Sequence, residues 1–159
     1  MAPMTQLRYE AADLGAGRWR YTYEAANLGL WVGGVPAAIQ EFTIWFDHAL
    51  YGTLVIATPD PVSNQWDEIV WQPEPALSDA GAYDALASLS QWRIDVGEAV
   101  FGFSVAFDWL GAGRPGRQYY EIIDPVTFET LDAGYTIPEP TTALLLGLGV
   151  LTAFRKRCA

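Results

Sequence analysis

The segment from Phe101 to Trp109 alternates strictly between large apolar residues and small or polar ones. Successive side chains of a β-strand point to opposite faces, whereas an α-helix repeats about every 3.6 residues, so this pattern favours a strand. An apolar face of this size has to be covered by another layer of the protein. The pattern therefore predicts a core strand with one apolar face, formed by Phe101, Phe103, Val105, Phe107 and Trp109.

Two more segments, Arg18–Ala25 and Gln40–Phe46, alternate in the same way. Shorter strand-like runs recur between Gly and Pro turns, a spacing typical of a β-sandwich. One short segment, Ala80–Leu89, is predicted to be helical. The sequence thus predicts an all-β fold, an antiparallel β-sandwich of about eight strands with one short helix. The other predicted strands are Gln6–Ala12, Leu50–Ala57, Trp66–Trp71, Gln118–Asp124 and Thr127–Leu131.

The aromatic content and the net charge of the chain limit the classes of partner that are expected. The seven Trp, eight Tyr and seven Phe residues suit strands and can fill the space between two sheets. Residues 1–136 carry a net charge of −12, because six arginines are set against 18 carboxylates. Nucleic acids and anionic membrane surfaces require cationic patches, so neither is an expected partner. The single cysteine, Cys158, lies near the C-terminus, so no disulfide is expected within the domain.

The last residues follow a different pattern. Pro138-Glu139-Pro140 precedes a charge-free run of 15 residues from Pro140 to Phe154. Because proline restricts its own φ and the residue before it, no regular structure is expected to cross this motif. A helix over the charge-free run would be about 22 Å long, shorter than the ~20 residues of a permanent span. The chain is therefore divided into a β-sandwich domain, 1–136, and a C-terminal hydrophobic helix within an anchor segment, 137–159. The cations Arg155, Lys156 and Arg157 that follow favour the cytoplasmic side of a membrane.

This tail resembles the PEP-CTERM sorting tail of Gram-negative bacteria, in which a Pro-Glu-Pro motif, a short hydrophobic helix and an Arg-rich end follow one another. The resemblance implies that Pro138, Glu139 and Pro140 are recognised by a membrane-embedded exosortase. It implies transient insertion in the inner membrane, removal of the tail, and a final location at the cell surface or in the extracellular matrix. A buried core helix and an ordinary tail anchor are the alternatives. Segments 102–111 and 120–128 are also similar to the bodies of many PEP-CTERM proteins, which supply no catalytic residues to transfer.

Such a tail is expected to accompany an N-terminal secretory signal peptide. The first ten residues, Met1–Glu10, contain neither a basic region nor an apolar region of that kind. A gene start further upstream, a trimmed leader and a vestigial tail would each explain this. We expect a missing leader, because a sorting tail requires export.

The sequence holds few candidates for catalysis. His48 is the only histidine, and no serine-hydrolase or zinc-protease motif accompanies it. The motif from Gly111 to Gly116 matches G-x-G-x-x-G, but a predicted strand follows it where a nucleotide-binding loop requires a helix. We therefore predict a protein that is not an enzyme and has no cofactor or dedicated metal site. A small hydrolase is the weaker alternative, and a single surface Ca²⁺ stays open.

Four tryptophans lie outside the best alternating strands and are candidates for stacking on sugar rings: Trp31, Trp66, Trp71 and Trp92. They would serve a carbohydrate-binding module, which is the alternative prediction. The tail, the strand pattern and the lack of a catalytic constellation instead predict a non-enzymatic exported protein that associates with extracellular polysaccharide.

Overall fold

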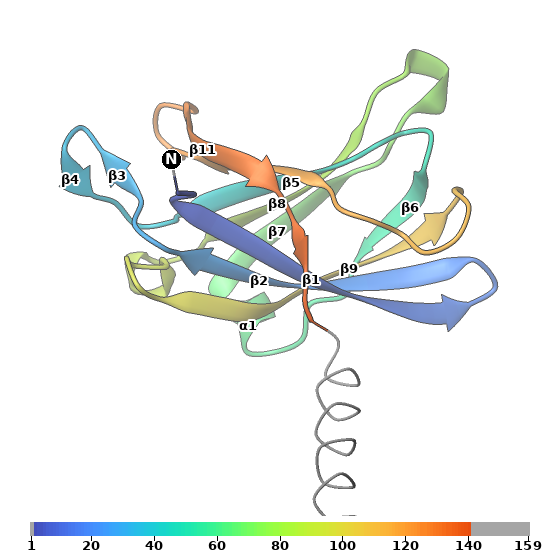
Figure 1. Ribbon diagram of the computed structural model, residues 1–159, viewed down its shortest axis with the longest axis horizontal. Helices are drawn as coiled ribbons and strands as arrows, with labels where there is room; N and C mark the ends of the chain where they lie inside the picture. The colour runs from blue at the N-terminus through green and yellow to red at the C-terminus, as the bar shows by residue number, and fades with distance from the viewer. Residues whose placement is uncertain (1, 141–159) are drawn as a thin grey trace, which may run out of the picture.

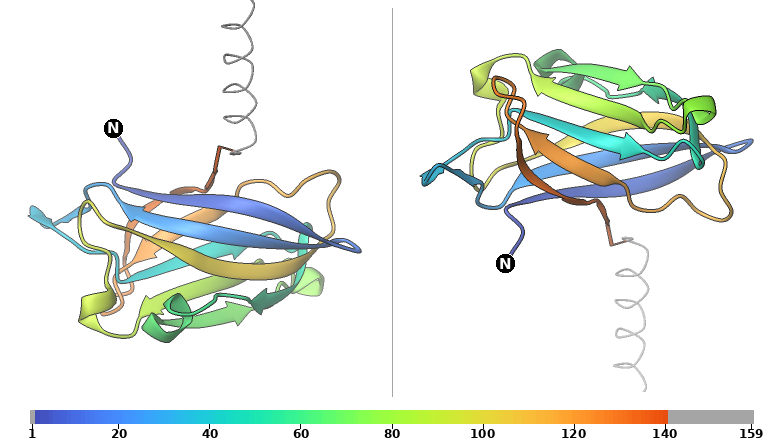
Figure 2. Two further views of the ribbon diagram at one scale, coloured as in Figure 1. Left: turned by 90° about the horizontal axis from the view of Figure 1, so that it is seen from below. Right: turned by 90° about the horizontal axis from the view of Figure 1, so that it is seen from above.

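A computed structural model describes residues 2–140 of the chain. Two five-stranded sheets pack face to face (Figures 1 and 2), which confirms the predicted β-sandwich. Neighbouring strands are antiparallel, apart from the parallel pair β12 and β1. In spatial order, the first sheet contains β12 (Ile137–Pro138), β1 (Thr5–Gly15), β2 (Arg18–Asn27), β9 (Ala99–Trp109) and β6 (Tyr51–Ile56).

The second sheet supplies the other layer of the sandwich. Its strands in spatial order are β11 (Thr130–Tyr135), β10 (Tyr119–Ile123), β5 (Glu41–Phe46), β8 (Gly81–Ala87) and β7 (Trp66–Trp71). A small hairpin of β3 (Trp31–Val32) and β4 (Val35–Pro36) projects from one end of the sandwich (Figure 1). The helical elements are short: α1 (Val62–Gln65) and the 3₁₀ turns Pro75–Leu77 and Ser90–Trp92.

Aromatic side chains fill the space between the sheets. Phe103 of β9 contacts Phe42 of the opposite sheet edge to face, with 4.9 Å between the ring centroids. It makes a second edge-to-face contact with Trp66 of β7 at 5.0 Å. These contacts join the two layers at the centre of the core, as the alternation of β5 and β9 predicts.

The strand β9 departs from perfect alternation at one point. Tyr23 of β2 pairs with Phe103, but the next residue, Glu24, pairs with Phe101, so Gly102 is an extra residue in a β-bulge. Gly102 has φ +123, a conformation that favours glycine. The bulge turns Phe101 outward, where 54% of it is exposed. The prediction that Phe101 shares the core face of Phe103 is therefore wrong.

The predicted helix Ala80–Leu89 is also wrong, because this segment forms strand β8, Gly81–Ala87. It is a central strand, hydrogen-bonded to β5 on one side and to β7 on the other. Its small residues permit close packing on both faces, and their helix propensity is overridden by the pairing. The one α-helix of the described residues is α1, four residues long.

The predicted strand Thr127–Leu131 overlaps β11 only in part. The Asp124 side chain accepts hydrogen bonds from the backbone N–H groups of Val126 and Thr127. Phe128 has a positive φ of 61°. Residues 124–129 therefore form the turn between β10 and β11, and the strand begins only at Thr130.

The Pro-Glu-Pro motif begins in an edge strand of the sandwich. Ile137 and Pro138 form β12, which pairs with Arg8 and Tyr9 at the edge of the first sheet. The N–H of Glu139 then donates to the carbonyl of Tyr9 at 2.9 Å. Strand β12 thus ends at the first proline of the motif, a position that an edge strand tolerates. Among residues 2–140, no helix is long and apolar enough to cross a membrane. The predicted hydrophobic helix and the cations Arg155, Lys156 and Arg157 lie outside the described residues.

Candidate functional site

A row of aromatic side chains crosses the outer face of the second sheet. Two of them are outward neighbours of buried residues, as Trp45 is of Ile44 and Tyr119 is of Tyr120. The strand register aligns them, because Trp45 and Trp71 both pair with Ala82, and Tyr119 pairs with Tyr135. Continuing the register of β5 and β10 places Tyr119 beside Trp45. We call Tyr135, Tyr119, Trp45 and Trp71 the aromatic row. Ala82 lies between its two tryptophans.

All four rings of the aromatic row are accessible. The exposed fractions are 54% for Tyr135, 39% for Tyr119, 38% for Trp45 and 53% for Trp71. Neighbouring strands are about 4.8 Å apart, so the row forms a strip of ring faces and edges across the sheet. Exposed aromatic residues aligned in this way form a candidate binding surface.

Contacts within the sheet orient the rings. Tyr119 and Tyr135 meet edge to face, with centroids 5.6 Å apart. The indole N–H of Trp45 donates to Glu121 Oε2 at 2.9 Å, and the Arg117 guanidinium lies 4.5 Å from the centroid of the Tyr135 ring. Rings held in this way lose less freedom when a ligand binds.

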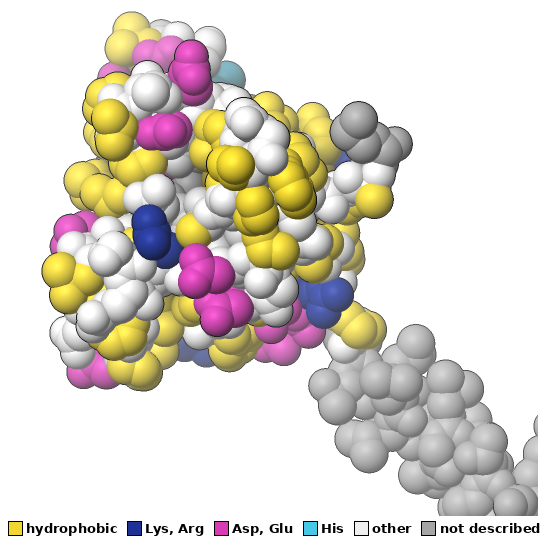
Figure 3. Space-filling model, turned by 90° about the vertical axis from the view of Figure 1, so that its left-hand side faces the viewer, with side chains coloured by type: hydrophobic (Ala, Val, Ile, Leu, Met, Phe, Trp, Pro, Cys, Tyr) yellow, Lys and Arg dark blue, Asp and Glu magenta, His cyan; other side chains and the backbone are white. Residues whose placement is uncertain are grey.

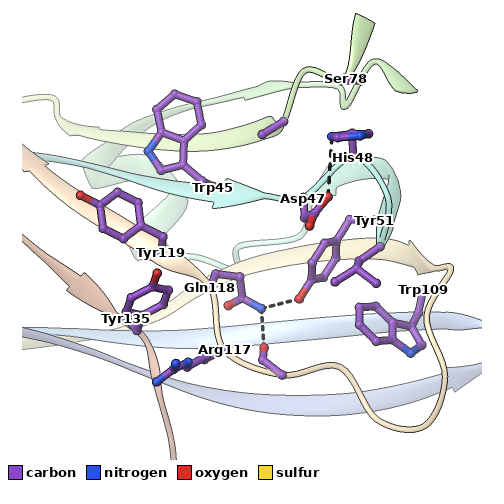
Figure 4. Close-up of a pocket in the computed structure, with 13 residues that line it drawn as sticks. Trp45, Asp47, His48, Tyr51, Ser78, Trp109, Arg117, Gln118, Tyr119 and Tyr135 are labelled. Carbon is purple, nitrogen blue, oxygen red and sulfur yellow. Dashed lines mark hydrogen bonds and ion pairs between the residues drawn. The ribbon is translucent and has the colours of Figure 1, made fainter. Parts of the chain in front are cut away.

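A cleft of about 660 Å³ adjoins the aromatic row. In Figure 4, Trp45, Tyr119 and Tyr135 line one side of the cleft and His48 and Trp109 the other. The polar residues Asp47, His48, Arg117 and Gln118 also line this cleft.

Buried polar side chains form the floor of the cleft. Gln118 Nε2 donates to the Tyr51 hydroxyl at 2.9 Å and to the carbonyl of Gly116 at 2.7 Å. The Tyr21 hydroxyl donates to the same carbonyl at 2.6 Å. Burial raises the pKa of the Tyr21 and Tyr51 phenols, so both stay protonated. The network fixes the floor and supplies no general base.

The structure brings His48 and Ser78 to this same cleft. Nδ1 of His48 lies 3.6 Å from Asp47 Oδ1, beyond hydrogen-bond distance. Among residues 2–140, no hydrogen bond joins Ser78 to His48. The arrangement therefore lacks the contacts by which a base activates a nucleophile.

The four predicted tryptophans have different environments. Trp71 belongs to the aromatic row, and Trp31, 55% exposed, lies on the separate β3–β4 hairpin. Trp92 is half-buried in a 3₁₀ turn. Trp66 is only 2% exposed and packs in the core, so its prediction as a stacking platform is wrong.

Trp45, Tyr119 and Tyr135 are not among the predicted site residues. The pattern of Gln40–Phe46 contained the necessary information, because placing Phe42, Ile44 and Phe46 in the core turns Trp45 outward. Recognising the row also requires the strand order, which brings β5 between β10 and β8.

Carboxylates lie on the same outer face. Asp84 accepts a hydrogen bond from Thr43 at 2.7 Å, and its carboxyl group interacts with that of Glu41. Burial and the nearby Asp84 raise the pKa of Glu41 to about 7, and burial also raises the pKa of Asp84.

Among the residues that the structure describes, no three metal-ligating side chains gather into a metal site. Figure 3, which shows an end of the molecule, has acidic side chains between hydrophobic ones.

The Glu41 pKa predicts a dependence of stability on pH. Because the folded state holds the proton more tightly, the stabilisation is complete below the unfolded pKa of about 4.5 and is lost as pH rises through about 7. Because water screens a partly exposed group, we expect the free energy of unfolding to fall by about 1 kcal/mol over this pH range. The Glu41→Gln variant should remove this loss in urea denaturation.

The wild-type chain and Glu41→Gln provide an internal control at low pH. Glutamine matches the shape of the protonated carboxyl, so the two should have similar free energies of unfolding near pH 4.5. At pH 8 the variant should be the more stable. A variant that loses stability between these pH values as steeply as the wild type would contradict the assignment.

Comparisons with known proteins identify the tail. Residues 136–157 match the model of the PEP-CTERM protein-sorting motif, which indicates an exported protein. No curated protein matches the chain by sequence.

Several solved structures are similar in part. One is a family 3b carbohydrate-binding module from the biomass-sensing system of Clostridium clariflavum, with 12% identity over 88% of this chain and 99% of that chain and a TM-score of 0.49. Another is a type I cohesin–dockerin complex from Clostridium thermocellum, with 12% identity, coverage of 84% and 99%, and a TM-score of 0.39. A type II cohesin module from Acetivibrio cellulolyticus has 11% identity, coverage of 87% and 95%, and a TM-score of 0.40. Likenesses at these TM-scores carry no information about function.

Proposed function

We propose that this exported protein is a non-enzymatic binder of extracellular polysaccharide and that the aromatic row is its binding surface. The observation that carries the proposal is the alignment of Tyr135, Tyr119, Trp45 and Trp71 on four of the five strands of one sheet. Sugar rings present apolar C–H faces that stack on aromatic rings, and the spacing of about 4.8 Å between strands is comparable with one pyranose ring. An extended glycan chain can therefore contact several rings at once.

Removal of both tryptophans of the aromatic row should weaken polysaccharide binding more than removal of either one. Each stacked ring contributes on the order of 1 kcal/mol, so Trp45→Ala and Trp71→Ala should each weaken binding about fivefold and the double variant about thirtyfold. Affinity electrophoresis through gels that contain neutral, cationic or anionic polysaccharides would measure this effect. Titrations followed by tryptophan fluorescence would give the dissociation constants.

Trp31→Ala is the matched control, since Trp31 is as exposed as Trp71 but lies on the β3–β4 hairpin. This variant should bind as tightly as the wild type. Equal losses in Trp31→Ala and Trp45→Ala would contradict the aromatic row as the binding surface. Failure of the wild type to bind any polysaccharide would reject the proposed function.

The second part of the proposal concerns the export and processing of the protein through its tail. We propose that an exosortase recognises Pro138-Glu139-Pro140, that the following segment enters the inner membrane transiently, and that cleavage leaves the domain at the cell surface or in the matrix. The sorting-motif match at residues 136–157 supports this route. Because Pro138 belongs to β12, cleavage beyond the motif would leave the sandwich whole.

Processing predicts a defined mass in the native host. From a gene extended upstream to include any leader, the secreted protein should be truncated close to Pro138-Glu139-Pro140, as intact mass spectrometry would show. A full-length species in the membrane fraction would identify an ordinary anchor. A full-length species confined to the cytoplasm would mean that the tail is inactive.

A further inference from the structure

A second hollow lies within the aromatic row, between its two tryptophans. It has a volume of about 450 Å³ and is lined by Trp45, Trp71, Asp79, Ala80 and Ala82. The register explains its shape, because Ala82 is paired with both tryptophans and its methyl group leaves space between them. Two indoles and a small floor thus form a slot that opens from the outer face.

Asp79 is the only charged residue that lines this slot. Its backbone is fixed by reciprocal hydrogen bonds with Glu74, at 3.0 Å and 3.2 Å. Among residues 2–140, no side chain forms a hydrogen bond or an ion pair with the Asp79 carboxylate. The carboxylate is therefore available to a ligand that enters the slot.

Indole faces together with a carboxylate favour a cation over a neutral or anionic group. An ammonium group gains about 0.5–2 kcal/mol over an aromatic face, and Trp is the best of the aromatic side chains for this contact. The carboxylate adds an ionic hydrogen bond. The net charge of −12 on residues 1–136 also attracts cations and repels polyanions.

We propose that the slot binds the protonated amino group of an amino-sugar polysaccharide. This inference rests on the proposed function, because the row continues from Trp45 to Tyr119 and Tyr135 and so fits a chain of rings. The amine lies between Trp45 and Trp71 with Asp79 as its hydrogen-bond acceptor, while neighbouring sugar rings stack along the row.

Glucosamine oligomers and N-acetylglucosamine oligomers of equal length test the proposal, at a pH where the free amines are protonated. The wild type should bind the glucosamine oligomer about tenfold more tightly in calorimetric titrations, and added salt should reduce the difference. Asp79→Asn should reduce the preference to the smaller part contributed by the indole faces, and it should leave binding of the acetylated oligomer unchanged. Glu74→Gln, which makes the same change of charge outside the slot, should keep the preference.

Several results would overturn the inference. Equal binding of both oligomers by the wild type, or a preference of undiminished size in Asp79→Asn, would reject the slot as an amine site while leaving polysaccharide binding intact. Tighter binding of an oligolysine peptide than of the glucosamine oligomer would assign the slot to cationic peptides. Binding of neither oligomer nor any other glycan would reject the proposed function itself.

Discussion

Phe103→Ala is expected to lower the free energy of unfolding by about 3–5 kcal/mol, the range for truncating a buried phenylalanine. Phe103 is fully buried at the centre of the sandwich. Its ring meets Phe42 and Trp66 edge to face, so the variant loses aromatic contacts between the two sheets and leaves a cavity between them. Because small domains are stable by about 5–15 kcal/mol, this loss should be visible in urea denaturation and in the melting temperature.

Phe101→Ala is the matched control on the same strand. The bulge at Gly102 turns Phe101 outward, so its truncation should change the free energy of unfolding by less than about 0.5 kcal/mol. A strand without the bulge would place both residues on the core face, as strict alternation predicts. Equal losses for the two variants would therefore contradict the register of β2 and β9.

The fold could be predicted from the sequence largely because alternation is a local property. Arg18–Ala25 and Gln40–Phe46 place their apolar residues inward, and both form strands of the sandwich. The predictions fail where pairing with neighbouring strands determines the secondary structure of a segment. The segment Ala80–Leu89 has residues that suit a helix, and only the pairing of β8 with β5 and β7 makes it a strand.

The candidate site was less predictable, because it depends on which strands are neighbours. Position outside the best alternating strands predicts that Trp71 is exposed, but the same criterion selects the buried Trp66. Trp45 and Tyr119 are far apart in sequence and become neighbours only through the order of β5 and β10. A single sequence gives the direction of each side chain within a strand, but the alignment of residues across a sheet requires the register.

Asn27→Ala is expected to lower the free energy of unfolding by roughly 3–4 kcal/mol, since buried polar groups left without partners cost about 1–3 kcal/mol each and do not add fully. Asn27 is fully buried at the end of β2. Its Nδ2 donates to the carbonyls of Ala37 at 2.8 Å and Ile94 at 3.0 Å. Its Oδ1 accepts from the N–H groups of Gly29 at 3.2 Å and Leu30 at 2.9 Å. One side chain therefore joins the end of β2 to the nearby segment at Ala37 and to the distant segment at Ile94.

Asp13 provides the comparison, because the chain repeats the motif Tyr-Glu-Ala-Ala-Asx-Leu-Gly at Tyr9 and Tyr23. Asp13 makes a similar turn, accepting from the N–H of Gly15 at 2.8 Å, but on the exposed β1–β2 hairpin. Asp13→Ala should therefore cost less than about 1 kcal/mol, because water replaces the lost bond. Asn27→Asp keeps the acceptor but sets a carboxylate oxygen against two carbonyls, so it should be no more stable than Asn27→Ala at neutral pH. Equal losses for Asp13→Ala and Asn27→Ala would show that the turn, rather than the buried donors, determines the effect.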